Sequence, residues 1–302
     1  MKLSITKDNS GWVVDDIVRD FKKYSRHSIV GLSDKPDAVW VTSLWAFRNI
    51  YKKIAKNIFL QIHHIEKTKI NEYDFHLFNK ARGCIVPNKI TEKDVKGYLK
   101  IPVYRLPYWL LSTRMEKISF DEVNNFKKKL CPNNEILIGS FQKDSVYNTN
   151  RPKLCKGADI FLNVIMELKK IINIKVVLAG YSRGFLIENF KKNKIPYVYF
   201  NRCKNINLLY DCLDWYAVTS RIEGGPQSVL ECSYRNIKIL SSPVGIAPEI
   251  LHPDCICNGV DDFVSKIKNN IDKKAYNKSV VDDIYLSNIL IPKWDDFFES
   301  HI

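Results

Sequence analysis

Apolar residues recur along the first part of the chain in short runs separated by amphipathic stretches. The runs predict buried strands at residues 3–6, 38–42, 58–62 and 83–86. Residues 12–24 carry apolar side chains at helical spacing, and residues 44–55 are also helix-like. Residues 88–98 are a further helix candidate, within which Thr91 with Asp94 three residues on resembles the capping box of a helix start.

A second series of the same kind follows a break at residues 106–112. It predicts further strands at residues 136–140, 175–179, 197–200, 213–219 and 237–241, with helices over 120–130 and 160–171 and from Pro226 onward. Strands that alternate with helices favour parallel sheets covered on both faces. We therefore predict an α/β protein with two doubly wound, Rossmann-like domains. Their expected ranges are 1–115 and 116–302, with the last helix packing either in the second domain or back on the first.

The composition is that of a globular protein, with 45% hydrophobic and 26% charged residues. No run approaches 18 apolar residues, and the first residues lack the apolar core of a signal peptide. The eight cysteines form no C-x-x-C pair, which favours reduced thiols over disulfides or a zinc site. We expect a cytoplasmic protein, either free or peripheral to a membrane.

The formal net charge of +14 is unevenly spread. Residues 1–112 contain 20 Lys and Arg against 11 Asp and Glu, so they carry +9 and the remainder carries +5. This basic half either faces an anionic membrane surface or another anionic partner, or reflects a lysine-rich composition. No nucleic-acid-binding motif accompanies the charge, so we expect no nucleic-acid partner.

The segment SRIEGGPQSVLECS, residues 220–233, is the clearest chemical signal in the chain. A predicted strand leads into Glu223, Gly224 and Gly225, and Pro226 suits a helix start. Backbone N–H groups at such a helix N-terminus bind anions. Glu231 falls on the second turn of the helix. The pattern indicates a phosphate-binding loop that carries two carboxylates.

The region from Asp214 to Glu249 resembles the donor-site pattern of the family 4 glycosyltransferases. Both have a strand that ends in Ser, then E-G-x-P, a helix with a second Glu, a strand and V-G-x-x-E, here in VGIAPE. Upstream, IGSF, KGADIF and VVLAG occur in the family's order. The resemblance covers roughly residues 136–251 in motifs and the N-terminal part in architecture.

The resemblance implies the GT-B fold, in which two Rossmann-like domains face one another across a cleft. It also implies transfer of a sugar from a nucleotide-diphosphate sugar with retention of configuration. That donor is a co-substrate, and no cofactor is expected. The expected acceptor is a glycan, a protein-linked glycan or a lipid-linked molecule.

The same resemblance assigns roles to residues of the second domain. Glu223 would contact hydroxyls of the donor sugar, and Glu231 would bind the ribose. The N–H groups of Gly224 and Gly225, with Pro226 beside them, would face the diphosphate or the sugar. Lys156 would neutralise the departing diphosphate.

The chain departs from the family pattern at the strand that ends near Gly139. The family has an Arg after this glycine, whereas Ser140 stands here. Lys143 or Arg151 is expected to substitute. Gly180 and Arg183, after the next strand, are further expected donor contacts, since ligands of open α/β sheets bind beyond the carboxyl ends of strands.

In the first domain, His63 and His64 follow a predicted strand and resemble the family's histidine that faces the donor sugar. Ser10 and Gly11 correspond to its loop after the first strand. Several of the candidate site residues also have a purely structural interpretation. A histidine at a strand end can be a polar cap, Glu231 can be a solvated helix residue, and Lys156 can be surface charge.

Three functions remain open at this point. The leading one is a retaining glycosyltransferase that works without metal, because the chain has no Asp-x-Asp pair and its anion-facing groups are cationic. The alternatives are an epimerase or phosphorylase on the same fold, and a non-catalytic module that binds a nucleotide sugar or a membrane surface.

Overall fold

A computed structural model describes residues 1–6, 13–53, 57–66, 69–147 and 149–302. This part of the chain forms two compact units. The first contains Met1–Ser112 and Asp283–Ile302, and the second contains Thr113–Asp282. Ser10 and Gly11 lie outside the described residues. Each unit is an α/β layer structure, as the alternating pattern predicts.

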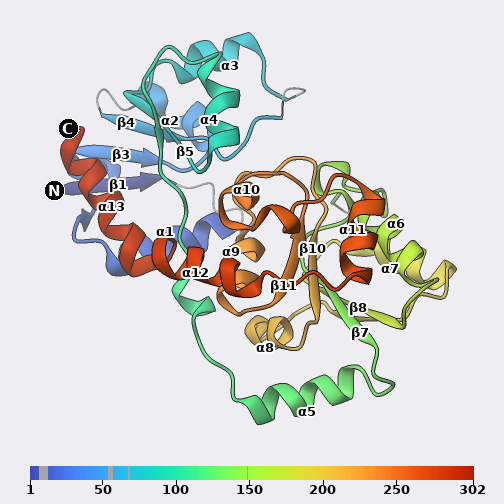
Figure 1. The fold of residues 1–302 in the computed structure, drawn as a ribbon. Coiled ribbons are helices and arrows are strands. Elements are labelled where there is room, and N and C mark those ends of the chain that lie inside the picture. Colours follow the sequence, from blue (N-terminus) through green and yellow to red (C-terminus); the bar gives the residue numbers. More distant parts are fainter. Residues whose placement is uncertain (7–12, 54–56, 67–68, 148) are drawn as a thin grey trace. The chain divides into compact units, whose positions relative to one another are not determined.

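Parallel strands form the sheet of the first unit in the order β2-β1-β3-β4-β5-β6 (Figure 1). They are β1 (Lys2–Thr6), β2 (Ser28–Ile29), β3 (Ala38–Val41), β4 (Ile58–Gln61), β5 (Gly83–Val86) and β6 (Val103–Arg105). The sequence predicts β1, β3, β4 and β5. It misses β2 and β6 because strands of two and three residues are too short to show a pattern.

The helices of the first unit are α1 (Val13–Tyr24), α2 (Leu44–Ile50), α3 (Glu72–Phe78), α4 (Lys89–Lys96) and α13 (Ser287–Ser300). α4 lies within the predicted range 88–98, but the expected capping box at Thr91 is wrong. Asn88 is the N-cap, and its side chain accepts a hydrogen bond from the backbone N–H of Thr91 at 2.8 Å. Asparagine is a better N-cap than threonine, so the cap falls one turn earlier.

The last helix, α13, packs on the sheet of the first unit (Figure 1). The ring of Trp294 lies 4.7 Å from that of Trp40 on β3, and the ring of Phe297 lies 5.2 Å from that of Phe59 on β4. These side chains are at most 7% exposed. Burying large aromatic rings is strongly favourable. The chain therefore returns to its first unit after completing the second.

The second unit has a parallel sheet in the order β11-β10-β7-β8-β9. Its strands are β7 (Ile136–Ser140), β8 (Ile174–Ala179), β9 (Tyr197–Phe200), β10 (Trp215–Val218) and β11 (Lys238–Ser241). All of them fall within or next to the predicted apolar runs. Because the strands are parallel, the loops that follow them gather at one edge of the sheet.

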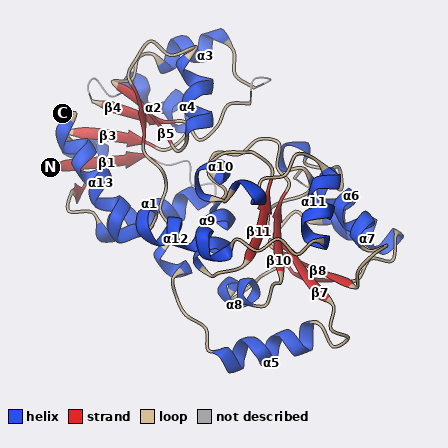
Figure 2. Cartoon of the chain, viewed as in Figure 1, coloured by secondary structure: helices blue, strands red, loops and turns tan. Residues whose placement is uncertain are grey.

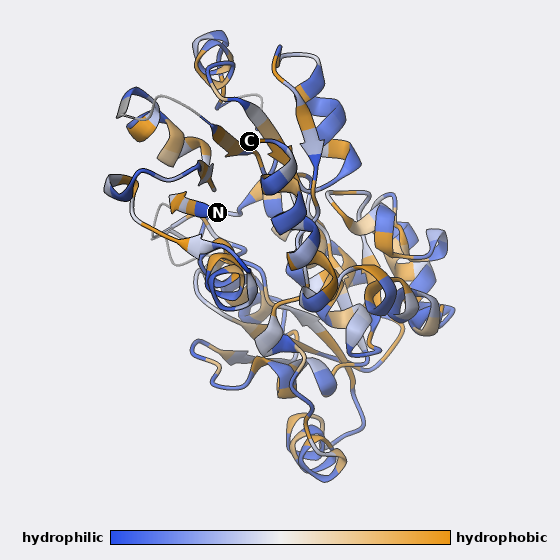
Figure 3. Cartoon of the chain, turned by 90° about the vertical axis from the view of Figure 1, so that its left-hand side faces the viewer, coloured by the Kyte–Doolittle hydropathy of each residue, from blue (hydrophilic) through white to orange (hydrophobic). Residues whose placement is uncertain are grey.

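Four helices connect these strands in sequence (Figure 2): α6 (Ala158–Leu168), α7 (Gly184–Lys192), α8 (Ile206–Asp211) and α9 (Gln227–Tyr234). α5 (Phe120–Leu130) precedes β7, and α10 (Ala247–Ile250), α11 (Val260–Lys268) and α12 (Lys274–Ile284) follow β11. Orange and blue segments alternate along many helices, as expected for amphipathic helices that cover a sheet (Figure 3). None of the described helices combines the length and apolarity of a membrane span.

Candidate donor-binding site

The loops after β7 and β10 are locked together at the carboxyl edge of the second sheet. Gly157 has a φ of +63°, and a Cβ there would lie 1.7 Å from the carbonyl oxygen of Thr219. The Thr219 hydroxyl donates to the Gly157 carbonyl at 2.9 Å. Only glycine fits this close approach. The Lys-Gly pair read from the sequence is thus a fixed contact between two loops.

Arg221 strengthens the same junction. Its guanidinium donates to both carboxylate oxygens of Asp159 at 2.7 and 2.6 Å, and its backbone N–H donates to the Cys155 carbonyl at 2.9 Å. Bidentate pairs of this kind fix geometry as well as add energy. The short 3₁₀ helix Leu154–Lys156 is therefore held in place against the loop that carries Glu223.

Lys156 and Glu223 form an ion pair at the centre of this junction. The Lys156 Nζ lies 2.5 Å from the Glu223 Oε1, and the Ser220 hydroxyl donates to the same oxygen at 3.1 Å. The two side chains are 23% and 10% exposed. The pair is therefore largely shielded from solvent but not fully buried.

Further lysines surround this pair. Burial lowers the pKa of Lys153 below its ordinary value, and the nearby positive charges of Lys156 and Lys143 lower it further. Lys153 is the N-cap residue of the 3₁₀ helix that ends at Lys156. Its half-buried ammonium is close enough to Lys156 for the two charges to influence each other. The predicted Lys143 is close enough to influence Lys153, and the predicted Arg151 is exposed.

Gly139 and Ser140 lie within β7. A Cβ on Gly139 would come within 2.2 Å of a Leu213 methyl group, so packing alone explains the glycine. Ser140 is buried, and its carbonyl accepts a hydrogen bond from the Arg183 Nη2 at 2.7 Å. Their expected contacts with a donor remain predictions.

Arg183 is buried beneath the loops rather than exposed above them. It is 2% exposed, and its Nε lies 2.9 Å from the Asp144 Oδ2. Burial lowers the pKa of Arg183 and raises that of Asp144. Gly180, three residues earlier, has a φ of +86°. The buried Arg183 side chain therefore connects the loop after β8 to the end of β7 and the loop that follows it.

The glycine loop leads into α9 as the motif predicts. Pro226 is the N-cap residue, and the helix begins at Gln227. Gly245 has a φ of +54°, and a Cβ there would lie 2.5 Å from the Gly224 carbonyl oxygen. The V-G-x-x-E segment therefore packs closely against the loop of Gly224 and Gly225.

Glu231, on the second turn of α9, is 6% exposed and has a donor on each carboxylate oxygen. The Arg114 Nε donates to Oε1 at 2.9 Å, and the Tyr210 hydroxyl donates to Oε2 at 2.5 Å. The solvated-helix interpretation of Glu231 is therefore wrong. Sequence reasoning missed Arg114 and Tyr210 because no local pattern links residues this far apart along the chain.

In the first unit, His63 has a partner on each ring nitrogen. Nε2 lies 2.7 Å from the Thr42 carbonyl oxygen, and Nδ1 meets the Tyr108 hydroxyl. A carbonyl only accepts, so Nε2 carries the proton and Nδ1 accepts from Tyr108. Burial raises the pKa of Tyr108, which keeps its hydroxyl proton in place. His64 is partly exposed, and its Nε2 lies 3.6 Å from the Glu66 Oε1.

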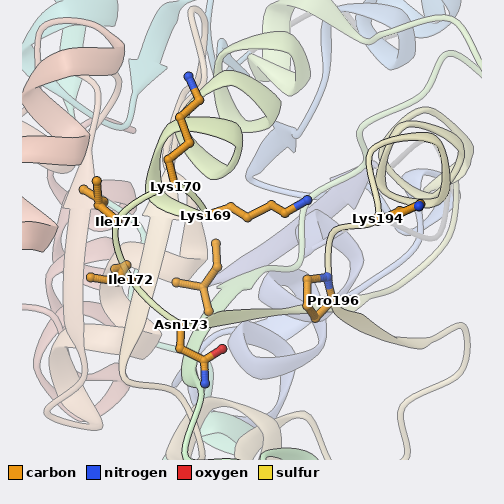
Figure 4. Close-up of a pocket in the computed structure, with 8 residues that line it drawn as sticks. Lys169, Lys170, Ile171, Ile172, Asn173, Lys194 and Pro196 are labelled. Carbon is orange, nitrogen blue, oxygen red and sulfur yellow. The ribbon is translucent and has the colours of Figure 1, made fainter.

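Among the described residues, no group of three or more His, Cys, Asp or Glu side chains is arranged to hold a metal ion. A cavity of about 450 Å³ lies at the opposite edge of the second sheet, before β8 and β9 (Figure 4). Its lining includes Lys169, Lys170 and Lys194. Lys169 donates to the Asn193 carbonyl and Lys170 pairs with Glu167. This cavity is separate from the loops that carry the sequence motifs.

Solved structures resemble the chain over its full length. HepE from Anabaena in complex with UDP matches with a TM-score of 0.79 and 11% identity, covering 99% of both chains. Its complex with UDP-glucose matches with a TM-score of 0.78 and 12% identity, again over 99% of both. A glycosyltransferase from Rickettsia africae ESF-5 matches with a TM-score of 0.77 and 12% identity, over 99% of this chain and 98% of that one.

At such low identities these matches establish the fold. The predicted GT-B glycosyltransferase fold, with its two Rossmann-like units, is confirmed. No protein-family model matches the sequence, and no curated protein sequence matches it.

Proposed function

We propose that the protein is a retaining glycosyltransferase that uses a nucleotide-diphosphate sugar and needs no metal ion. The observation that carries this proposal is the Lys156–Glu223 pair, which lies between two locked loops at the carboxyl edge of the second sheet. Open α/β sheets bind their ligands at this edge. The similar HepE structures are complexes with UDP and with UDP-glucose, which makes UDP the first nucleotide to test.

In this proposal, the donor diphosphate replaces Glu223 as the partner of Lys156. The Lys156 ammonium then neutralises the charge that grows on the diphosphate as its bond to the sugar breaks. Lys153 and Lys143 add positive charge nearby, and N–H groups at the start of α9 face the phosphates. This cationic environment supplies the role that Mg²⁺ has in other transferases.

Glu223, released from Lys156, accepts hydrogen bonds from hydroxyls of the donor sugar, and Glu231 accepts from the ribose. His63 or His64 contributes to the sugar site from the first unit. The acceptor is a glycan, a protein-linked glycan or a lipid-linked molecule. Residues 1–112 contain 20 basic and 11 acidic residues, and this positive charge favours an anionic acceptor or an anionic membrane surface.

Turnover of a panel of nucleotide sugars tests the proposal. We expect slow hydrolysis of one donor without acceptor and faster transfer with one, both at an unchanged rate in chelator. An α-linked donor should give an α-linked product in NMR spectra. Inverted product, or activity that chelator abolishes and Mg²⁺ restores, would contradict the mechanism. Nucleotide binding without any turnover would favour the non-catalytic module.

Acceptor saturation at increasing salt tests the basic half. An anionic acceptor or surface should bind progressively more weakly as salt screens its charge. If acceptor binding does not change with salt, the positive charge of residues 1–112 reflects a lysine-rich composition alone.

A further inference from the structure

The Glu231 carboxylate is held from two sides by residues that lie far from it in the sequence. Arg114 Nε donates to one oxygen at 2.9 Å, and the Tyr210 hydroxyl donates to the other at 2.5 Å. A buried carboxylate needs such partners, since removing its charge from water is costly. The two donors also fix the direction in which its remaining lone pairs point.

Both donors are themselves held in place. Tyr210 is 2% exposed, and its ring lies 4.8 Å from that of Phe141. The Arg114 carbonyl accepts a hydrogen bond from Arg235 Nη1 at 2.9 Å, and Arg235 also pairs with Asp211, the neighbour of Tyr210. One network therefore connects α8, α9 and the segment with which the second unit begins. A network of this kind holds a side chain in one orientation.

We propose that Arg114 and Tyr210 are positioning residues that orient Glu231 to accept the 2′- and 3′-hydroxyls of a ribonucleoside diphosphate. This inference rests on the proposed function, which places the ribose at Glu231. An ionised carboxylate offers about four lone-pair positions. Among the described residues, Arg114 and Tyr210 use two of them, which leaves two for a pair of vicinal hydroxyls.

The arrangement predicts selectivity for ribose over deoxyribose. A site built to hydrogen-bond a hydroxyl rejects the analogue that lacks it, because its own polar group is then left unpaired. The selectivity depends on the direction of the carboxylate as well as on its presence. It should therefore fall when either positioning residue is removed, even though Glu231 remains.

Calorimetric titration with UDP and with 2′-deoxy-UDP tests the inference. The wild-type protein should prefer UDP by about tenfold or more, the effect of one hydrogen bond to a charged group. In Arg114→Met and in Tyr210→Phe the preference should fall to about threefold or less. The affinity for inorganic pyrophosphate should stay within about twofold of wild type, because the phosphate-binding groups are untouched.

Two further variants separate positioning from general effects. Arg114→Lys keeps the charge without the guanidinium geometry and should recover part of the preference. Lys117→Met removes an exposed charge from the same segment and should leave the preference unchanged. If Arg114→Met does not fold, Tyr210→Phe, which removes a single oxygen, decides the question.

Each outcome has one interpretation. Variants that keep the wild-type preference, or that lose UDP, 2′-deoxy-UDP and pyrophosphate binding equally, overturn the inference and make the network purely structural. A wild-type protein that binds UDP without preferring it to 2′-deoxy-UDP also overturns it. If UDP and the corresponding diphosphates of the other bases all fail to bind, the proposed function fails as well.

Discussion

The two units handle polar groups at strand ends in different ways. In the first unit, the ring of His63 is fixed between the Thr42 carbonyl and the Tyr108 hydroxyl, and its hydrogen bonds are satisfied within the unit. In the second unit, Lys156 and Glu223 satisfy each other across two loops and remain partly exposed. In the proposed function, a ligand that carries both an anion and hydroxyl groups replaces both halves of this pair.

The two sites differ in what a ligand would gain by binding to them. Breaking the hydrogen bonds of His63 would leave polar atoms unpaired and gain nothing. Exchanging the partner of Lys156 for a diphosphate keeps its charge compensated. We therefore expect the affinity for the nucleotide to depend on residues of the second unit.

The largest effect on transfer and on UDP binding is expected for Lys156→Ala. Loss of the cation should lower the rate of transfer by about 10²–10³-fold, as for removal of one group that stabilises a transition-state charge. UDP binding should weaken by about 1.5–3 kcal/mol. Initial rates and calorimetry would measure the two effects. Lys169→Ala, at the opposite edge of the same sheet, is the matched control and should change neither.

Gly157→Ala should disrupt the junction that holds Lys156. A left-handed conformation alone costs a residue with a side chain about 1–2 kcal/mol, and the new methyl group would also collide with the Thr219 carbonyl. We expect a loss of at least about 2 kcal/mol in the unfolding free energy, measured with urea. Gly97→Ala is the control, since Gly97 has a φ of −72° and open space around it. Equal stability of both variants would contradict the locked junction.

The lowered pKa of Lys153 should make UDP binding depend on pH. The ammonium is charged below its pKa, so affinity should fall as the pH rises through this lowered value. A bound diphosphate favours the charged form, so binding at a pH where part of the Lys153 ammonium has lost its proton should take up a proton. Titration in two buffers with different ionisation enthalpies measures the uptake. If Lys153→Gln takes up as many protons as wild type, the lysine does not contact the phosphate.

The smallest effect on UDP binding is expected for a substitution in the first unit. Tyr108→Phe removes the hydroxyl that His63 Nδ1 accepts from, and it should cost about 1–3 kcal/mol of stability by leaving a nitrogen unpaired. UDP affinity should not change. A marked loss of UDP affinity in this variant would remove the contrast between the two units.

Much of the fold could be predicted from hydrophobic runs, because central strands such as β3 and β10 are buried on both faces. Edge strands β2 and β6 could not, since each has too few residues for a pattern. The docking of α13 on the first unit depends on aromatic rings from distant parts of the chain. Such contacts leave no local periodicity.

The candidate site shows the same division. Lys156, Glu223 and Glu231 could be identified because a loop-and-helix motif keeps them at fixed spacing. Lys153 had a weak signal, its position three residues before Lys156. Arg114 had none, because it meets Glu231 only through the tertiary fold. Arg183 looked like a donor contact from its place after Gly180, but the structure buries it on Asp144.

A crystal structure with UDP bound would test the central claim most directly. We expect Lys156 Nζ to leave Glu223 and to lie about 3 Å from a phosphate oxygen, with Glu223 turned toward the position of the sugar. A nucleotide bound elsewhere, such as in the cavity lined by Lys169 and Lys194, with the Lys156–Glu223 pair intact, would contradict the account.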